Sequence, residues 1–390
     1  MEFAFTEEQI MIRDTAAAFL AEVSDSESVR RAMSSDLGYD EALWRRICGE
    51  MYWQAIHLPE AVGGLGLGYV ELAATMEQMG RSLLCAPFFS TVALASNAIR
   101  MLATDEQQEQ LLPRLIEGET ATLAWMSAGQ RDHLSGVAGR YHKDGDGYVL
   151  EGDYRYVVDG HSSQLLLLAA EGEQGVQVFV VESSTEGVSC EWLPTMDQTR
   201  RQAAVKLAGV ELPSSAVLGD AAADASEGFE AVLHLATIAL AAEQVGVAQQ
   251  ALDATVEYIA ERQQFNRPVG SFQAVKHKAA DMMLKSEVAR SAVYYAACVA
   301  EDALAGGPLA TELAEAASIA KAYCSEAARF NTGVGIQLHG GVGFTWEYDI
   351  QLYFKRAQSS YQLLGEPAAH REQVAAMLLD DASPAEKGEA

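Results

Sequence analysis

Two stretches of the sequence combine residue types that could bind a ligand, and the first of them suits a diphosphate. In ERQQFNRPVGSFQAVKHKAADM (261–282), a helix is expected to end near Phe265, with Asn266 free to take a positive φ. Ser271 is expected to cap the helix that follows. Arg262 would then lie at the end of one helix and beside the N-terminus of the next, where a guanidinium and free N–H groups can bind a diphosphate. A surface ion pair is the alternative interpretation of Arg262.

The second stretch is QLHGGVGFT (337–345), which follows an alanine-rich segment. Gly340 and Gly341 permit a ligand to approach the backbone closely, although a helix C-cap with a turn explains them equally well. GGLGLG (63–68) is predicted to be a tight loop between helices, because no strand precedes it as a nucleotide-binding loop would require. The histidines and cysteines lack metal-ligand spacing, so no metal is expected.

Composition excludes several classes of partner. The chain has 390 residues and a formal net charge of −28, which repels nucleic acid and anionic membranes. No run approaches the roughly 18–20 apolar residues that span a bilayer, and MEFAFTEEQIMIRD does not resemble a signal peptide. Five scattered cysteines suggest no disulfide framework, so we expect a cytoplasmic location.

The elements that must position these residues fall into three zones. Residues 1–117 show helical periodicity, with Thr6 as an N-cap, and residues 118–222 contain short β-rich runs of a sandwich or barrel. Residues 223–380 return to long helices, including about 273–304, 309–332 and 365–379, and 381–390 form a tail. The order predicts an α+β fold, mostly α, with a helical domain, a β domain and a C-terminal four-helix bundle.

In this order the segments resemble the acyl-CoA dehydrogenase family over nearly the whole chain. The resemblance is carried by PEAVGGLGLGYVELAATMEQMGRSL (59–83), LPTMDQTRRQAAVKLAGVELPSS (193–215), the 261–282 stretch and QLHGGVGFTWEYDIQLYFKRA (337–357). It implies the same three domains, a tetramer, and removal of two hydrogens from an acyl-CoA. In the family a glutamate takes the α-proton, FAD accepts the β-hydride, and an electron-transfer flavoprotein receives the electrons.

The resemblance also implies where FAD binds. In the family the flavin end lies between the β domain and bundle of one subunit, and the bundle of a second subunit holds the ADP end. The residues that match this ADP clamp are Arg262, Gln264, Phe265, Gln273, Gln337, Gly340 and Gly341. All of the family's residue types are therefore present on this side of the cofactor.

The family's base is not where the resemblance places it. Its two usual positions correspond to Leu364 and Ala236, and neither side chain accepts a proton. Two glutamates lie nearby in sequence. Glu243 is seven residues after Ala236, roughly 10 Å along the helix, and Glu366 is two residues after Leu364, where it could instead complement a helix dipole.

The flavin-facing runs of the β domain depart from the family as well. WMSAGQRDHLSG (125–136) replaces a Thr-Glu-Pro stretch, and Tyr156, Val157 and Val158 replace a Trp-Ile-Thr run, so Val158 offers no hydroxyl. The pattern resembles subunits of heteromeric bacterial acyl-CoA dehydrogenases of the steroid side-chain type.

Three functional hypotheses follow. The chain is a dehydrogenase subunit that needs a second acyl-CoA dehydrogenase-like subunit. Alternatively it is a self-sufficient homomer that assembles with further copies of itself as a dimer of dimers. Glu243 or Glu366 is then a displaced base. The third hypothesis is a flavoprotein of the same fold with another reaction. A non-enzymatic scaffold would leave the clamp without a purpose.

Overall fold

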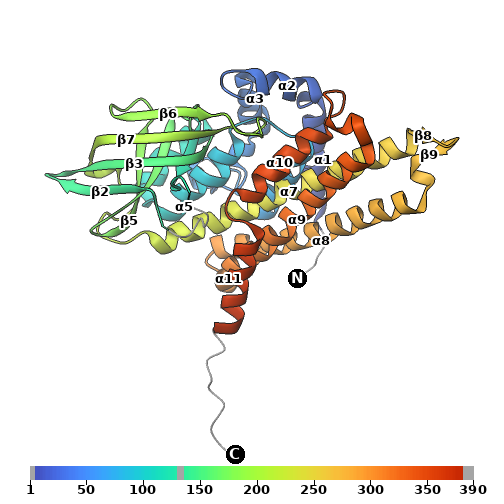
Figure 1. The fold of residues 1–390 in the computed structure, drawn as a ribbon. Helices are drawn as coiled ribbons and strands as arrows, with labels where there is room; N and C mark the ends of the chain where they lie inside the picture. Colours follow the sequence, from blue (N-terminus) through green and yellow to red (C-terminus); the bar gives the residue numbers. More distant parts are fainter. Residues whose placement is uncertain (1–4, 130–135, 381–390) are drawn as a thin grey trace, which may run out of the picture.

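The computed structural model describes residues 5–129 and 136–380 (Figure 1). The tail and the middle of the 125–136 stretch therefore lie outside the described residues. A sheet domain occupies one end of the molecule in Figure 1, and the long C-terminal helices extend away from it. The N-terminal helices pack beside both. The helix–sheet–helix order confirms the predicted fold class, while the boundaries at 117/118 and 222/223 stay predictions.

The N-terminal zone is helical. Thr6 caps its first helix by accepting from the backbone N–H of Gln9, as predicted. The GGLGLG stretch is a loop between a 3-10 turn (Glu60–Val62) and the helix α4, and a side chain at Gly64 would overlap the carbonyl of Leu58. The helices of this zone are α1 (Glu7–Val23), α2 (Ser26–Ser34), α3 (Glu41–Arg46), α4 (Tyr69–Arg81), α5 (Asn97–Leu102) and α6 (Asp105–Ile116).

The middle zone is one seven-stranded mixed sheet of order β1-β4-β2-β3-β7-β6, in which β5 also pairs with β4. One group of its side chains packs on the helices, and a second forms a separate core with the rings of Tyr141, Tyr148 and Phe179 in contact. The strands are β1 (Ala121–Ala124), β2 (Gly139–Asp144), β3 (Gly147–Val158), β4 (Leu165–Gly172), β5 (Gly175–Glu182), β6 (Val188–Leu193) and β7 (Gln202–Pro213).

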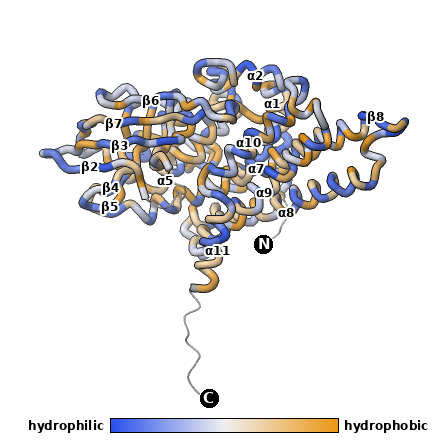
Figure 2. Tube along the Cα trace, viewed as in Figure 1, coloured by the Kyte–Doolittle hydropathy of each residue, from blue (hydrophilic) through white to orange (hydrophobic). Residues whose placement is uncertain are grey.

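The C-terminal zone is built around one apolar helix, α7. Figure 2 shows the helices of this zone packed around it. By length and composition α7 could cross a membrane, but 94% of its most apolar window is buried inside the protein, so packing accounts for its hydrophobicity. The helices are α7 (Ser226–Glu261), α8 (Gln273–Leu304), α9 (Leu313–His339), α10 (Ile350–Gln362) and α11 (Pro367–Asp380).

A two-stranded hairpin, β8 (Gln263–Gln264) and β9 (Arg267–Pro268), joins α7 to α8 at the end remote from the sheet (Figure 1). Phe265 and Asn266 take positive φ values of 53° and 60° there, which confirms the expected turn at Asn266. The predicted cap by Ser271 is wrong: Ser271 ends a 3-10 turn, and Phe272 precedes α8 without any side-chain cap. The tight turn displaces the helix start by one residue.

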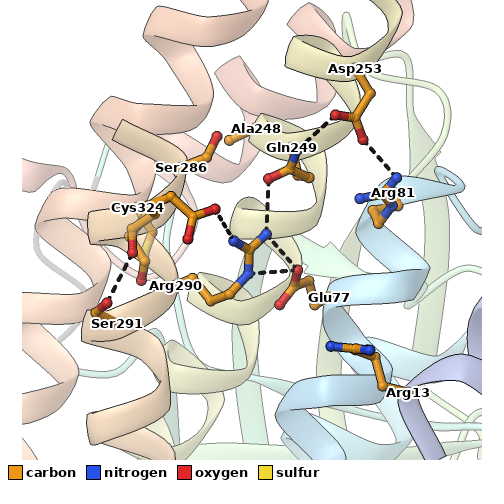
Figure 3. A network of polar contacts seen from close by, with 12 residues as sticks. Arg13, Glu77, Arg81, Ala248, Gln249, Asp253, Ser286, Arg290, Ser291 and Cys324 are labelled. Atoms are coloured by element: carbon orange, nitrogen blue, oxygen red, sulfur yellow. Dashed lines mark hydrogen bonds and ion pairs between the residues drawn. The ribbon is translucent and has the colours of Figure 1, made fainter. Parts of the chain in front are cut away.

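Two glycines allow α4 of the first zone to cross α7 with the backbones in contact. A side chain at Gly246 would overlap the carbonyl of Glu77, and one at Gly80 would overlap the carbonyl of Glu243. Figure 3 shows the polar network at the edge of this crossing, which joins α4, α7 and α8. Its ion pairs and hydrogen bonds are Arg290–Glu77, Arg290–Gln249, Gln249–Asp253 and Arg81–Asp253.

Candidate active site

An open pocket of about 540 Å³ lies between the sheet domain and the C-terminal end of α10. Tyr156 borders it from β3, with a φ of 60° and a side chain that is 46% exposed. Val158 points away: its side chain is buried in the core, and its carbonyl accepts from the hydroxyl of Thr122. The remaining lining residues are Met126, Gly129, Thr195, Met196, Asp197, Gln202, Gln358, Ser359, Gln362, Leu363 and Glu366.

The turn after α10 forms one wall of this pocket and is fixed by two buried side chains. His370 donates from Nε2 to the carbonyl of Leu364 at 2.7 Å. The Lys321 ammonium donates to the carbonyls of Ser360 at 3.0 Å and Gly365 at 2.9 Å, so it satisfies acceptors that the helix end leaves open. Burial lowers the pKa of Lys321 to about 7. Sequence reasoning missed this support.

The two base positions of the resemblance both belong to the main hydrophobic core. Leu364 and Ala236 are both fully buried, and Leu364 takes a φ of 59°, a left-handed conformation that is costly for a branched residue. The contacts of Lys321 and His370 maintain that conformation. Neither position presents a proton acceptor to the pocket.

Glu243 lies in a buried ion network rather than at the pocket. Its carboxylate contacts the guanidinium groups of Arg200 and, at 2.9 Å, Arg356. Asp197 completes the network through Arg356, 3.3 Å away. Burial alone would raise the pKa of Glu243, but Arg200 and Arg356 hold it below its usual value. A carboxylate bound by two cations is a weak base, and the Glu243 side chain is only 4% exposed.

Glu366 has the opposite surroundings. Its side chain is exposed and borders the open pocket, one residue before α11 begins at Pro367. The backbone carbonyl accepts from the N–H groups of Ala369 and His370, which leaves the carboxylate at the start of the helix. Of the two displaced-base candidates, only Glu366 is therefore placed where a ligand in the pocket could reach it.

The clamp residues cluster at the other end of the bundle. Arg262 is the C-cap of α7, and Phe265 at the hairpin tip is 86% exposed. Gln337 accepts from the ammonium of Lys278 at 3.2 Å. Gly340, with a φ of 67°, ends α9. The exposed members are Arg262, Gln264, Phe265, Gln273, Gln337, Gly340 and Gly341.

These residues fit the ADP end of FAD. A Cβ at Gly340 or Gly341 would meet nothing within 4 Å, so the backbone there is open to a close ligand. Within residues 5–129 and 136–380, the guanidinium of Arg262 has no ion pair, which does not support the alternative of a surface ion pair. Below them the ring of His339 stacks on Tyr258, 4.4 Å between centroids, and supports the end of α9.

Other parts of the site were not anticipated. The role of Arg200 and Arg356 in the ion network could not be predicted from the sequence. The adjacent pair Arg200 and Arg201 was nevertheless a signal, because acidic residues outnumber basic ones in this chain. Arg201 donates to the backbone carbonyl of Asp36 and so joins the sheet domain to the N-terminal helices. No group of histidine, cysteine or acidic side chains suited to a metal occurs in the described part of the chain.

Family models match both helical zones: the acyl-CoA dehydrogenase N-terminal domain over residues 6–119 and the C-terminal domain over 228–379. Acyl-CoA dehydrogenase IpdE2 of Mycolicibacterium smegmatis is 34% identical over 369 residues, 95% of this chain and 97% of that protein. IpdE2 of Mycobacterium tuberculosis is 35% identical, covering 93% of this chain and 94% of the relative.

Solved structures are also similar to this chain over nearly its whole length. A variant of the Tcur3481-Tcur3483 steroid ACAD superposes with a TM-score of 0.86 at 31% identity, covering 96% of this chain and 99% of that one. The ChsE4-ChsE5 complex of Mycobacterium tuberculosis gives 0.87 at 25% identity, covering 99% and 100%. This chain therefore belongs to the acyl-CoA dehydrogenase family and is an FAD-dependent oxidoreductase.

Proposed function

We propose that this chain is one subunit of a heteromeric acyl-CoA dehydrogenase that desaturates an acyl-CoA thioester between its α and β carbons. The chain lends its ADP clamp to the FAD of a second acyl-CoA dehydrogenase-like subunit, and that partner contributes the base and the flavin-facing wall. Electrons leave to an electron-transfer flavoprotein. The expected assembly is α2β2 with one FAD in each heterodimer.

The main support for this proposal is a contrast between the pocket and the clamp. At the pocket, Leu364 and Ala236 are buried and apolar, and Glu243 is bound in an ion network. At the clamp, every residue that the family uses is present and exposed, from Arg262 to Gly341. In a homodimer both sites would be equivalent by symmetry, and each would have the same incomplete pocket.

The pocket and the clamp also belong to different regions of the bundle. The clamp lies at the hairpin, where α7 ends, and α7 is about 54 Å long at 1.5 Å per residue. The pocket is lined by residues of the sheet domain and of the C-terminal end of α10. A clamp so exposed can serve a neighbouring subunit, and two similar structures are of paired proteins, Tcur3481-Tcur3483 and ChsE4-ChsE5.

The role of this chain in the reaction is to bind and orient. The guanidinium of Arg262 would neutralise the diphosphate of FAD, and the side-chain amides of Gln273 and Gln337 would donate to its polar groups. The open backbone at Gly340 and Gly341 would admit the ligand closely. FAD, when bound, supplies the hydride acceptor. The proton is taken by a group that this chain does not provide.

The test is to purify the chain alone and together with the product of the neighbouring gene. We expect half an FAD per chain and turnover of acyl-CoA in the mixture only. One FAD per chain with turnover by the lone protein would refute the proposal. The electron acceptor is tested in the same assay by replacing an artificial dye with electron-transfer flavoprotein.

One observation favours a second candidate, a self-sufficient homomer. Glu366 is exposed at the rim of the pocket, which is where a displaced base would be useful. Under this candidate the lone protein is active, and Glu366→Gln lowers its rate by at least about 10²-fold. Gln362→Ala, at an exposed lining residue of the same pocket, is the matched control and should leave most of the rate intact.

A further inference from the structure

The ion network around Glu243 occupies the junction of all three zones. Arg200 comes from the end of the sheet domain, Glu243 from α7 and Arg356 from α10, and each side chain is at most 5% exposed. Arg200 also lies over the ring of Phe89, 4.8 Å from its centroid, in the N-terminal zone. With Asp197, which pairs with Arg356, two positive groups meet two negative ones.

Such an arrangement is a poor device for stability alone. Transferring charged groups from water into the protein costs several kcal/mol per ion, and apolar side chains of similar volume can replace buried ion triads with no loss. An apolar filling of this junction could therefore have stabilised the fold as well. The charges point to a role that apolar side chains could not fill.

The network lies between a large open pocket and a much smaller inner cavity. Asp197 borders the 540 Å³ pocket, and its partner Arg356 borders an inner cavity of about 20 Å³, which is room for a single water. The lining of this small cavity also includes Asp159, Thr199 and Tyr39, and its apolar part is formed by Met76, Met79, Leu84, Phe88 and Phe89. The charged groups of the network therefore stand between the open pocket and these apolar side chains.

We propose that Asp197, Arg200, Glu243 and Arg356, here named the ionic plug, exclude the acyl chain of a thioester from this chain's own pocket. An alkyl group advancing from the open pocket would meet ion pairs that it cannot solvate, and separating them would leave unpaired buried charges. The acyl-CoA is then taken only at the partner's site. This inference rests on the proposed function and names the subunit that receives the substrate.

The experiment uses the assembled protein and 3-thiaoctanoyl-CoA, a probe whose sulfur at the β position has no hydrogen to lose. Calorimetric titration should give one equivalent per heterodimer for the wild type. Arg200→Ala with Glu243→Ala removes one charge of each sign and opens the passage, and we expect one additional equivalent. The matched control is Arg81→Ala with Asp253→Ala, which removes a partly exposed ion pair of the α4–α7 contact (Figure 3) and should leave the count unchanged.

A second measurement does not depend on the variant folding. In a crystal structure of the wild-type assembly with the probe, the alkyl chain should lie in the partner's pocket alone. An alkyl chain beyond Asp197 in this chain, or a folded double variant without the additional equivalent, would overturn the inference. FAD content and turnover decide the proposed function separately, because neither quantity reports where the alkyl chain lies.

Discussion

At the scale of single residues, the surroundings of Glu243 determine what it can do. Two guanidinium groups bind its carboxylate, one from the sheet domain and one from α10. Glu243→Gln would remove the charge and leave both arginines buried without the carboxylate that pairs with each of them. We expect a loss of about 3–5 kcal/mol in the free energy of unfolding, measured in urea. Glu366→Gln, at an exposed site, should change it by less than about 0.5 kcal/mol.

The position of Leu364 gives a second prediction. Restoring the family's residue with Leu364→Glu would place a carboxyl group in the main hydrophobic core, where burial raises its pKa and keeps it protonated. We expect no turnover by the lone chain and a loss of at least about 3 kcal/mol in stability. Gln362→Glu, two residues earlier and exposed, should cost little. Turnover in the Leu364→Glu chain would mean that the turn can rearrange to expose the new side chain.

At the scale of elements, Lys321 makes stability depend on pH. Its pKa is about 7 in the folded chain and near 10.5 when unfolded, so between these values the unfolded state binds more protons. The free energy of unfolding should therefore rise from pH 7 towards pH 10. Lys321→Met should abolish this rise and leave the carbonyl of Gly365 without this donor, while the carbonyl of Ser360 keeps the side-chain amide of Gln244. An unchanged slope in the variant would assign the pH dependence to another group.

The crossing of α4 and α7 depends on glycine at one position and not at another. Gly246→Ala would force a methyl group into the carbonyl of Glu77, and we expect a loss of about 3 kcal/mol or more. Gly333 lies in the interior of α9, where an added methyl group would meet nothing within 4 Å. Gly333→Ala should instead stabilise the chain by about 0.5–1 kcal/mol, because it restricts the unfolded chain. Thermal melts of both variants compare the two effects directly.

The sequence was informative where periodicity is local and uninterrupted. The helix expected at 273–304 is α8, because its pattern is continuous over its whole length. The helix expected at 309–332 begins and ends later, as α9, since a 3-10 turn precedes it and Gly340 alone ends it. The ionic plug could not be predicted, because Glu243 is 43 residues from Arg200 and 113 from Arg356, and they meet only when three zones pack.

At the scale of the whole molecule, the charge is unevenly distributed. The chain carries −28 overall, yet the hairpin and the start of α8 bear Arg262, Arg267, Lys276 and Lys278. A local positive field at this end favours a diphosphate that the rest of the surface repels. At the clamp, the acidic character of the protein is therefore locally reversed.

The clamp gives a prediction for the assembly. Arg262→Ala in the complex with the partner should weaken FAD retention by roughly 10- to 150-fold, as expected for the loss of a charge-assisted contact. Arg267→Ala is the control in the same hairpin, since its guanidinium lies over the Phe272 ring at 3.9 Å. The rate of FAD release after dilution distinguishes the two variants. Equal release rates would remove Arg262 from the cofactor site.

The ionic plug has a consequence for how the chain loses its structure. Arg356 donates to the carbonyl of Thr199 in the sheet domain and contacts Leu84 in the N-terminal zone, while Arg200 lies over Phe89. If any one zone detached, water would enter the junction, and the charges left behind would lose partners that the other zones supply. The three zones are therefore bound into a single cooperative unit: they should melt together in one calorimetric transition, and a fragment that ends before α10 should fail to fold.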